Sequence, residues 1–337
     1  MIKLLLSFLS NILSKNRLYY VVDNAKWSIR HDGIMITNNL TKIKSSVTLT
    51  HLGIRNSIVH YGSIGSFISR NKIKPAHSSN RIIVTWFHVV QNDERLRMIP
   101  KADKYVNLWH TSCYSMKDKM ISMGIPDNKI VVIPLGVDTN IFKLDKQSGI
   151  KDLPTDSIVI GSFQKDGNGW EDGDSPKLIK GPDIFCEAVK RLSERYNIFV
   201  LLTGPSRGYV KNRLDKMKIQ YRHDYLENVN SLVNYYNSID LYIITSREEG
   251  GPKALLESFA CGVPLVSTKV GMAPELIDHN ENGYLVDLED VDGIYSYACK
   301  ILDSKEVSNR FASNGLKTVG RYDWKKISEE YIKFLYS

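Results

Sequence analysis

The chain contains few cysteines, and they lie far apart. The four cysteines among 337 residues are Cys113, Cys186, Cys261 and Cys299. They form no Cys-x-x-Cys motif and no dense disulfide framework, and no cluster of His and Cys has the spacing of a metal site. This pattern excludes a small disulfide-stapled fold and is typical of a protein of the reducing cytoplasm.

Long apolar runs, low-complexity tracts and repeats of fixed period are also missing. The apolar part of "MIKLLLSFLSNILSKNR" (1–17) is too short to span a bilayer, and it lacks an obvious small-x-small cleavage site, which disfavours a signal peptide. Its apolar residues could form one stripe of a helix that packs on the protein or lies at a membrane interface. Peripheral membrane contact through residues 1–17 therefore stays open.

The overall composition is that of a globular protein with a sizeable core. Hydrophobic residues make up 42% and charged residues 24% of the chain. Because 337 residues exceed the usual size of one hydrophobic core, two domains are expected. The formal net charge of +8 favours acidic ligands such as nucleotides or phosphates. The basic residues form no single block, so nucleic acid is not an expected partner.

Short apolar runs alternate with segments of helical period, which predicts βα units and mostly parallel sheets. The runs in the first part of the chain are 18–22, 46–50, 57–61, 81–87, 104–109 and 129–134. Those in the second part are 157–163, 197–204, 241–246, 264–268 and 283–286. The pattern predicts an α/β protein with two similar Rossmann-like domains, 1–142 and 143–337. A terminal helix within 323–336 could pack back on the first domain.

The stretch "REEGGPKALLESFACG" (247–262) combines a loop with the start of a helix. The loop follows a predicted strand, and ligands of α/β folds bind beyond the carboxyl ends of the strands. Gly250 and Gly251 would let the backbone approach a phosphate, and a helix opened by Pro252 would offer amides and partial positive charge. Glu257, roughly 7.5 Å along the helix, would suit the ribose of a nucleotide. A capped helix with solvated glutamates is the alternative.

These residues resemble the Glu-x7-Glu signature of family 4 of the retaining glycosyltransferases. "EGGPKALLESFACGVPLVST" and "VGMAPELIDHNENGYLV" carry it. Further segments of the family are resembled by "IIVTWFH", "VVIPLGVDTNIF", "GSFQKDG" and "KLIKGPDIFCEAV", so that the likeness extends from about residue 81 to 290. It implies the GT-B fold, with two facing Rossmann-like domains and a cleft between them. It also implies a nucleotide diphospho-sugar as donor substrate and no cofactor.

The resemblance implies a set of site residues. The expected catalytic residues are Glu249, Lys180 and His88. The expected substrate-binding residues are Glu257, Gly250, Gly251, Lys165, Lys253, Asn24 and Trp27. Glu257 would hold the ribose, Glu249 would contact the donor sugar, and Lys180 would pair with the donor phosphates. His88, at the carboxyl end of a strand, would face the donor sugar from the N-terminal domain.

Three segments depart from the family's pattern. Lys165 stands near the place where the family usually has an arginine, and it is the expected substitute. Gly251 and Pro252 replace an aromatic residue and a glycine, which removes one backbone amide from the loop. A glycine-rich acceptor loop is not evident in the N-terminal part, where Asn24 and Trp27 would take its place near the acceptor.

The reaction implied is retaining, metal-independent transfer of a hexosyl group from the donor to an acceptor glycan or glycolipid, in cell-surface polysaccharide or glycan synthesis. Alternatives are a catalytically silent nucleotide-sugar-binding scaffold of the same fold and a sugar-nucleotide epimerase or a phosphorylase, which share the architecture. A metal-dependent glycosyltransferase would need an Asp-x-Asp at a strand end. "EDGD" (171–174) and "EDVD" (289–292) contain this pattern but close no predicted strand, so they are interpreted as turns.

Overall fold

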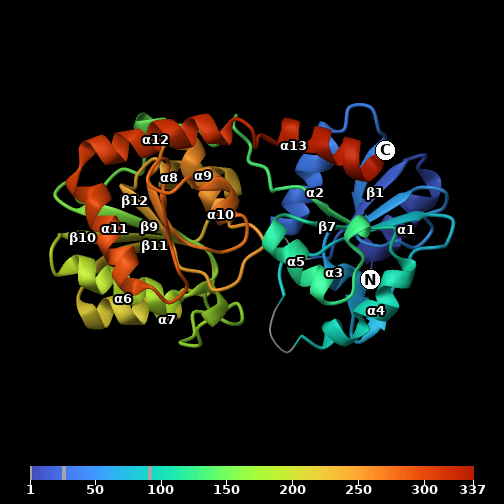
Figure 1. Cartoon of the computed structure of the whole chain (residues 1–337), viewed down its shortest axis with the longest axis horizontal. Helices are drawn as coiled ribbons and strands as arrows, with labels where there is room; N and C mark the ends of the chain where they lie inside the picture. Colours follow the sequence, from blue (N-terminus) through green and yellow to red (C-terminus); the bar gives the residue numbers. More distant parts are fainter. Residues whose placement is uncertain (1, 25–27, 90–92) are drawn as a thin grey trace. The chain divides into compact units, whose positions relative to one another are not determined.

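The computed structural model describes residues 2–24, 28–89 and 93–337 of the chain. It consists of two compact units (Figure 1): unit 1 comprises Met1–Gly136 and Asp323–Ser337, and unit 2 comprises Val137–Tyr322. The division falls six residues before the predicted boundary at 142. Residues 323–337, numbered with the second domain but with a helix expected to be able to pack back on the first, belong to unit 1, where Trp324 is buried against Gly136.

Unit 1 is built on a parallel sheet of six strands in the order β2-β1-β3-β6-β7-β8. Its strands are β1 (Leu18–Val21), β2 (Ser45–Thr48), β3 (Ile58–Tyr61), β6 (Arg81–Thr85), β7 (Leu108–Thr111) and β8 (Ile130–Val132). All neighbouring strands pair in parallel. A short antiparallel hairpin, β4 (Ile68–Ser69) with β5 (Lys72–Ile73), lies outside this sheet. The predicted parallel arrangement is therefore confirmed.

Helices cover both faces of this sheet (Figure 1). The longer ones are α1 (Ile2–Leu13), α2 (Ser28–Asn39), α5 (Tyr114–Ser122) and α13 (Trp324–Tyr331), and the chain continues from α13 into a π-helical turn, η7 (Ile332–Tyr336). Helix α13 packs beside α2, although nearly 300 residues separate them. Short helices α3 (Ile64–Phe67) and α4 (Ile99–Ala102) lie on the side of α5. Among the described helices, none has the length and apolar character needed to cross a bilayer.

A buried polar network joins the sheet of unit 1 to its last helix. His110 Nδ1 lies 2.9 Å from the hydroxyl of Thr85, and its Nε2 lies 3.2 Å from the hydroxyl of Tyr331. His60 lies 2.7 Å from the same threonine hydroxyl and 2.6 Å from the hydroxyl of Tyr336. Burial lowers the pKa of His110 to about 4 and holds the pKa of His60 well below its usual value. Both imidazoles are therefore neutral at physiological pH.

Unit 2 has a second parallel sheet of six strands in the order β11-β10-β9-β12-β13-β14. The strands are β9 (Ile158–Phe163), β10 (Ile198–Thr203), β11 (Gln220–Asp224), β12 (Leu241–Ile244), β13 (Leu265–Thr268) and β14 (Tyr284–Val286). This is the 3-2-1-4-5-6 order of the Rossmann fold, which changes direction between β9 and β12. The carboxyl ends of these two neighbouring strands are where such folds bind ligands.

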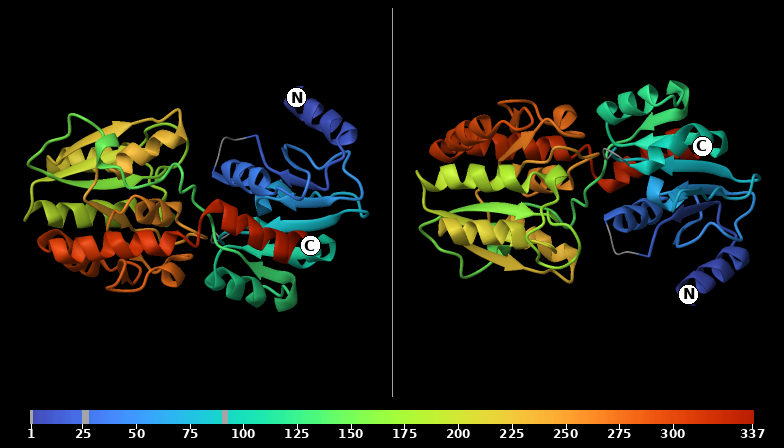
Figure 2. Two further views of the ribbon diagram at one scale, coloured as in Figure 1. Left: turned by 90° about the horizontal axis from the view of Figure 1, so that it is seen from above. Right: turned by 90° about the horizontal axis from the view of Figure 1, so that it is seen from below.

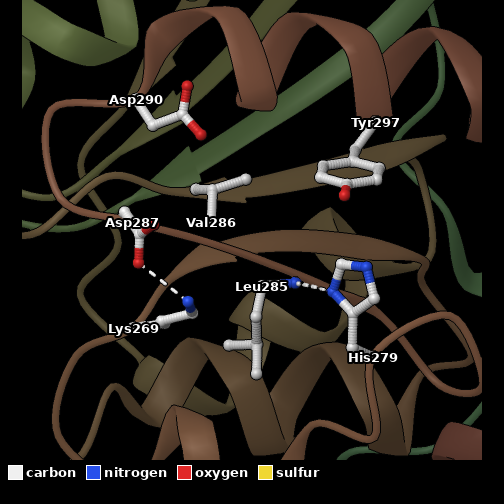
Figure 3. A pocket seen from close by; sticks show the side chains of 7 residues that line it. All are labelled: Lys269, His279, Leu285, Val286, Asp287, Asp290 and Tyr297. Atoms are coloured by element: carbon white, nitrogen blue, oxygen red, sulfur yellow. Dashed lines mark hydrogen bonds and ion pairs between the residues drawn. The ribbon is translucent and has the colours of Figure 1, made fainter.

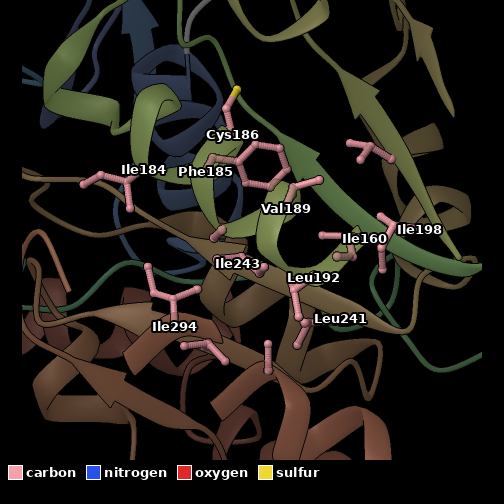
Figure 4. Close-up of a cluster of buried hydrophobic side chains, with 14 of the residues drawn as sticks. Ile160, Ile184, Phe185, Cys186, Val189, Leu192, Ile198, Leu241, Ile243 and Ile294 are labelled. Carbon is pink, nitrogen blue, oxygen red and sulfur yellow. The ribbon is translucent and has the colours of Figure 1, made fainter. Parts of the chain in front are cut away.

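Two layers of helices enclose the sheet of unit 2. On one face lie α6 (Pro182–Ser193), α7 (Gly208–Met217) and α11 (Val291–Asp303). On the other lie α8 (Leu232–Tyr236), α9 (Lys253–Ala260) and α12 (Lys305–Val319), with the short α10 (Ala273–Leu276) after β13. Figure 4 shows part of the core, where Phe185, Val189 and Leu192 of α6 meet apolar side chains of the strands. Central strands covered on both faces have continuous apolar sequences, which is why most of these strands could be predicted from the sequence.

Candidate functional site

Two loops meet at the point where the strand order of unit 2 reverses. One begins at Gln164 after β9, and the other runs from Thr245 to Pro252 after β12. A 3₁₀ turn, η5 (Leu178–Lys180), precedes α6 and lies against the second loop, because the backbone amide of Arg247 donates to the carbonyl of Ile179 at 2.8 Å. Side chains from three separated stretches of sequence thus surround one edge of the sheet.

Lys180 is placed by a close approach of the turn η5 to the loop after β12. Gly181 follows with φ 62° and ψ 39°, and a Cβ at this position would lie 1.9 Å from the carbonyl oxygen of Thr245. The Thr245 hydroxyl donates to the Gly181 carbonyl at 2.8 Å. With the backbones held this close, Lys180 Nζ forms an ion pair with the carboxylate of Glu249. Glycine at 181 is therefore required by conformation and by space.

Further polar groups surround the Lys180–Glu249 pair. The hydroxyl of Ser246 donates to Glu249 Oε1 at 3.0 Å. Partial burial and the positive charge of Lys180 lower the pKa of Lys177, and the Glu249 carboxylate acts in the opposite direction. Lys165 also contributes to this lowering, and its Nζ lies 4.0 Å from the ring centroid of Trp170. The charges of Lys180, Glu249 and Lys165 thus all act on Lys177. Lys177 was not predicted because its local sequence is that of an ordinary surface lysine.

The glycine loop before α9, which contains Gly250 and Gly251, packs against the loop after β13. Gly271 has φ 52°, and a Cβ there would lie 2.5 Å from the carbonyl oxygen of Gly250 and 2.8 Å from that of Glu249. The structure places Pro252 at the N-cap, with φ −68° and ψ 104°, so the prediction that it opens the helix was wrong by one position. Lys253 is the first helical residue. The extended backbone at Pro252 sets the direction from which the loop enters the helix.

Glu257 lies one turn into α9, where its carboxylate meets an aromatic cluster. Tyr236 donates a hydrogen bond to Glu257 Oε2 at 2.8 Å. The Tyr236 ring packs against Phe163 at 4.9 Å and against Tyr242 at 5.6 Å between ring centroids. Burial and the negative charge of Glu257 raise the pKa of Tyr236 well above its usual value, so the phenol remains a donor. Tyr236 was not predicted, because nothing in its local sequence distinguishes it from a core tyrosine.

A buried arginine holds the loop after β9 in place. Arg207 donates to the carbonyl oxygens of Ser162, Gln164 and Thr203 at 2.7, 2.7 and 2.9 Å. It also pairs with Asp166 at 3.0 Å, and both side chains are almost fully buried. Burial raises the pKa of Asp166, and the charge of Arg207 opposes this. Arg207 thereby joins the ends of β9 and β10 and fixes the loop that carries Lys165.

A second arginine ties the loop after β12 to the beginning of α6. The guanidinium of Arg247 binds both carboxylate oxygens of Asp183, at 2.8 and 2.7 Å, and donates to the carbonyl of Leu178 at 2.7 Å. It also donates to Glu289 at 2.8 Å. Hydrogen bonding to Asp183 is the main cause that raises the pKa of Arg247. This planar, two-pronged contact resists shear between the two segments that carry Lys180 and Glu249.

The remaining predicted residues lie in unit 1 or outside the described residues. His88 is half-buried three residues after the end of β6, and its carbonyl accepts from the Trp86 indole at 2.9 Å. Asn24 is exposed after the end of β1. Trp27 lies outside the described residues. The structure thus brings together Lys165, Lys180, Glu249 and the glycine loop within unit 2, and the roles assigned to all these residues stay predictions.

The two Asp-x-Asp patterns have structural partners. Asp172 pairs with Lys211 of α7 at 2.5 Å and accepts from the backbone amide of Arg207 at 2.8 Å. Asp174 pairs with Arg213 at 2.9 Å. In the second pattern the carboxylate of Asp290 caps α11 by accepting from the amide at 293, 2.8 Å away. These carboxylates hold turns and helix ends, as the interpretation of both patterns as turns requires.

A surface hollow of about 420 Å³ lies elsewhere on unit 2 (Figure 3). It is lined by Lys269, His279, Leu285, Val286, Asp287, Asp290 and Tyr297. Lys269 and Asp287 pair with each other at 2.8 Å and are both exposed. His279 Nδ1 accepts from the backbone amide of Leu285 at 3.1 Å. Lys269 thus pairs with Asp287 in solvent and Asp290 caps α11, and the lining includes none of the predicted site residues, so we place the candidate site at the ends of β9 and β12.

Part of unit 2 matches a known sequence family. Residues 177–318 match the glycosyl transferases group 1 family model. This group 1 region contains Lys177, Lys180, Glu249 and Glu257, and it begins where the turn η5 approaches the loop after β12. Arg207 lies in the same region, and Lys165, after β9, lies before it.

Two relatives illustrate the range of similar proteins. The N-acetyl-alpha-D-glucosaminyl L-malate synthase of Bacillus anthracis is 25% identical over 220 residues, which cover 63% of this chain and 54% of the synthase. The UDP-Gal:alpha-D-GlcNAc-diphosphoundecaprenol alpha-1,3-galactosyltransferase of Escherichia coli is 28% identical over 241 residues, covering 65% of this chain and 59% of the relative. The chain thus spans little more than half the length of these curated relatives.

Solved structures show the same fold. HepE of Anabaena, in complex with UDP and glucose, superposes with a TM-score of 0.74 at 16% identity, covering 96% of this chain and 100% of that one. A glycosyltransferase from Rickettsia africae superposes with a TM-score of 0.68 at 16% identity, covering 95% and 97%. The predicted fold class, GT-B with two Rossmann-like domains, is confirmed by these likenesses.

Proposed function

We propose that the protein is a retaining glycosyltransferase that moves a sugar from a nucleotide diphospho-sugar to an acceptor hydroxyl and requires neither a metal ion nor a cofactor. The observation that carries the proposal is the ion pair of Lys180 with Glu249, set among further lysines at the switch point of a Rossmann sheet. Its position within the group 1 region supports it.

The charges at this edge suit a donor with a diphosphate. Lys180 and Lys165 offer positive charge to the phosphate oxygens, and Lys177 adds to the local field. The start of α9 adds backbone amides and the positive end of the helix dipole. These groups would stabilise the negative charge that grows on the leaving diphosphate as the glycosidic bond breaks, which lowers the barrier to transfer.

The two glutamates would hold the donor at either side of the diphosphate. Glu249 is kept beside Lys180 by the ion pair and by Ser246, so a sugar hydroxyl near the phosphate could donate to its carboxylate. Glu257 lies deeper along α9 and is oriented by Tyr236, where it could accept from the hydroxyls of a ribose. Gly250 and Gly251 leave room for the phosphates to approach the backbone.

The acceptor side is proposed for unit 1. His88 and Asn24 follow β6 and β1 at their carboxyl ends, the positions at which α/β sheets bind ligands. We propose His88 as the residue facing the donor sugar, with Asn24 and Trp27 nearer the acceptor. The acceptor would be a glycan or glycolipid of cell-surface polysaccharide synthesis, since the similar protein of Escherichia coli is named for transfer to a diphosphoundecaprenol-linked sugar.

Product analysis tests the proposal. The purified chain is incubated with a panel of nucleotide sugars, with and without glycan acceptors, and nucleoside diphosphate release and sugar transfer are measured. Thermal shift with the same nucleotides first selects the donor base, because a ligand that binds the native state raises the unfolding midpoint. We expect release of nucleoside diphosphate together with sugar transfer. The product should keep the anomeric configuration of the donor.

Each other outcome identifies a rival. An epimerised sugar without release of nucleoside diphosphate would indicate a sugar-nucleotide epimerase. Binding of a nucleotide sugar without turnover would indicate a catalytically silent scaffold. Inverted anomeric configuration would contradict the retaining mechanism. Activity abolished by EDTA and restored by a divalent ion would contradict the metal-independent reaction. Activity that is unchanged by EDTA would agree with the proposal.

A further inference from the structure

Helix α1 attaches to unit 1 through polar side chains. Asn11 is buried, and its amide donates to the carbonyl oxygens of Thr50 at 2.9 Å and Leu52 at 3.0 Å. One turn earlier, the hydroxyl of Ser7 accepts from a backbone amide of the same loop at 3.4 Å. Phe8 adds a partly buried apolar contact with the loop. The face of α1 turned toward the protein therefore combines the polar contacts of Asn11 and Ser7 with apolar contacts of Phe8 and Ile12 at Gly53.

The opposite face of α1 is apolar and exposed. The side chains on it are Ile2, Leu5, Leu6, Leu9 and Leu13, with Ile12 at the edge beside Gly53, and their exposed fractions lie between 45% and 81%. At 3.6 residues per turn they form a stripe roughly 120° wide, centred opposite the buried Asn11. A surface helix of a globular protein normally buries its apolar stripe, whereas α1 leaves most of its apolar residues exposed. Both views of Figure 2 show α1 projecting at the edge of unit 1.

The chain around this helix is strongly basic. Residues 1–92 contain twelve Lys and Arg but only two Asp and no Glu, and no acidic residue occurs between 33 and 92. The remaining residues contain 33 basic and 35 acidic side chains, so the first 92 residues account for the whole net positive charge. The basic residues form no block in the sequence, but in residues 1–92 they greatly outnumber the acidic residues.

Part of this charge lies next to α1. Lys3 is exposed on the helix itself, and Lys15 and Arg17 are exposed directly after it. The backbone amide of Arg17 donates to the carbonyl of Lys44 at 2.8 Å, which brings a further exposed lysine to the end of the helix. An apolar stripe flanked by lysine and arginine is the pattern of helices that lie in the plane of a bilayer surface.

We propose that α1 binds an anionic lipid bilayer, with its leucine stripe among the acyl chains and the flanking basic residues on the headgroups. The helix has 12 residues, so it would lie along the surface rather than cross it. A second copy of the chain is a poorer occupant, because two strongly positive segments would repel each other. The inference stands apart from the glycosyltransferase proposal and does not depend on it.

Vesicle flotation with the full chain tests this binding. The probes are vesicles of phosphatidylglycerol and phosphatidylcholine in equal parts, with pure phosphatidylcholine as the neutral comparison. The test variant is Leu5→Gln with Leu9→Gln, which removes two exposed leucines from the stripe while keeping good helix formers. Ser10→Gln, an exposed position outside the stripe, is the matched control. A charge variant, Lys15→Glu with Arg17→Glu, tests the electrostatic part.

The unchanged protein and the Ser10→Gln control should float with the anionic vesicles, and the double glutamine variant should bind at least about tenfold more weakly. The charge variant and added salt should both weaken binding. Unchanged circular dichroism and thermal midpoints would show that all variants are folded. The proposal is overturned if the protein does not float, if it binds neutral vesicles equally well, or if the leucine replacement abolishes a dimer and leaves flotation unchanged.

Discussion

The phenol of Tyr236 donates a 2.8 Å hydrogen bond to Oε2 of Glu257, and the tyrosine ring makes a T-shaped contact with Phe163 and a tilted contact with Tyr242. The ring comes from the last turn of α8 and the carboxylate from α9, so the bond orients the glutamate from a neighbouring helix. Because the tyrosine is fully buried, its rotamer is restricted, and so is the direction of the carboxylate.

Tyr236→Phe should raise KM for the nucleotide sugar about tenfold with a smaller effect on kcat, because a hydrogen bond to a charged group contributes about 1.5–3 kcal/mol. Steady-state kinetics with varied donor measure this. Tyr196→Phe is the matched control, since Tyr196 donates to the carboxylate of Asp303 at 2.7 Å on the surface before β10. Equal changes of KM in the two variants would contradict the role of Glu257 in binding the donor substrate.

Lys180→Ala should lower kcat by about 100- to 1000-fold while the protein stays folded, because it removes a charge that stabilises the leaving diphosphate. Glu257→Ala should also abolish most activity. Lys190→Ala, at an exposed lysine of α6, serves as the control and should leave kcat unchanged. Wild-type turnover in both the Lys180 and the Glu257 variants would contradict the assignment of the site.

Gly181→Ala should destabilise unit 2 by several kcal/mol and abolish activity, because a Cβ would lie 1.9 Å from the Thr245 carbonyl. Gly169 also has a positive φ, of 74°, but a Cβ there meets nothing within 4 Å. Gly169→Ala should therefore cost only about 1 kcal/mol for the strained backbone. Denaturant unfolding of both variants separates steric overlap from conformational strain, and similar losses would show that the close approach is unimportant.

Arg207→Lys should reduce activity and stability together, since lysine cannot donate to three carbonyl oxygens and pair with Asp166 at once. Leaving Asp166 poorly paired in the interior should cost about 3 kcal/mol or more in unfolding free energy. Thermal unfolding and donor kinetics provide the two measurements. Arg213→Lys, at the more exposed pair with Asp174, is the control. A stable Arg207→Lys variant with normal KM would contradict the positioning role.

Unit 1 should lose stability as the pH falls from about 6.5 to about 4. The folded pKa of His110 is lowered to about 4, so over this range the unfolded chain binds a proton that the native state does not. The shift corresponds to roughly 3 kcal/mol for this imidazole alone, with His60 acting in the same direction. Denaturant unfolding across this range measures the slope. His110→Gln should flatten it, and an unchanged slope would exclude this histidine as its source.

The apolar runs predicted the central strands well, because parallel strands enclosed by helices must be apolar on both faces. β11 was missed for the converse reason. Its sequence is Gln-Tyr-Arg-His-Asp, it lies at the edge of its sheet, and every residue in it is partly or fully exposed. A polar edge strand has no hydrophobic pattern to distinguish it from a loop.

The residues of the candidate site could be predicted from the sequence only where they belong to one short motif. Glu249 and Glu257 are eight positions apart, and their spacing together with the glycines indicates a loop followed by a helix. Tyr236, Arg207 and Lys177 approach these groups through tertiary packing across tens of residues. Their local sequences resemble those of ordinary core or surface residues, so pattern alone could not select them.

The discontinuity of unit 1 has a consequence for biosynthesis. Unit 2 is one continuous stretch, Val137–Tyr322, inserted between the two parts of unit 1. A ribosome therefore completes unit 2 before it supplies Trp324, Tyr331 and Tyr336, whose buried rings pack within unit 1. Until then His60 and His110 lack their tyrosine partners. The second half of the chain can thus reach its native state first, which reverses the usual N-to-C order of domain folding during synthesis.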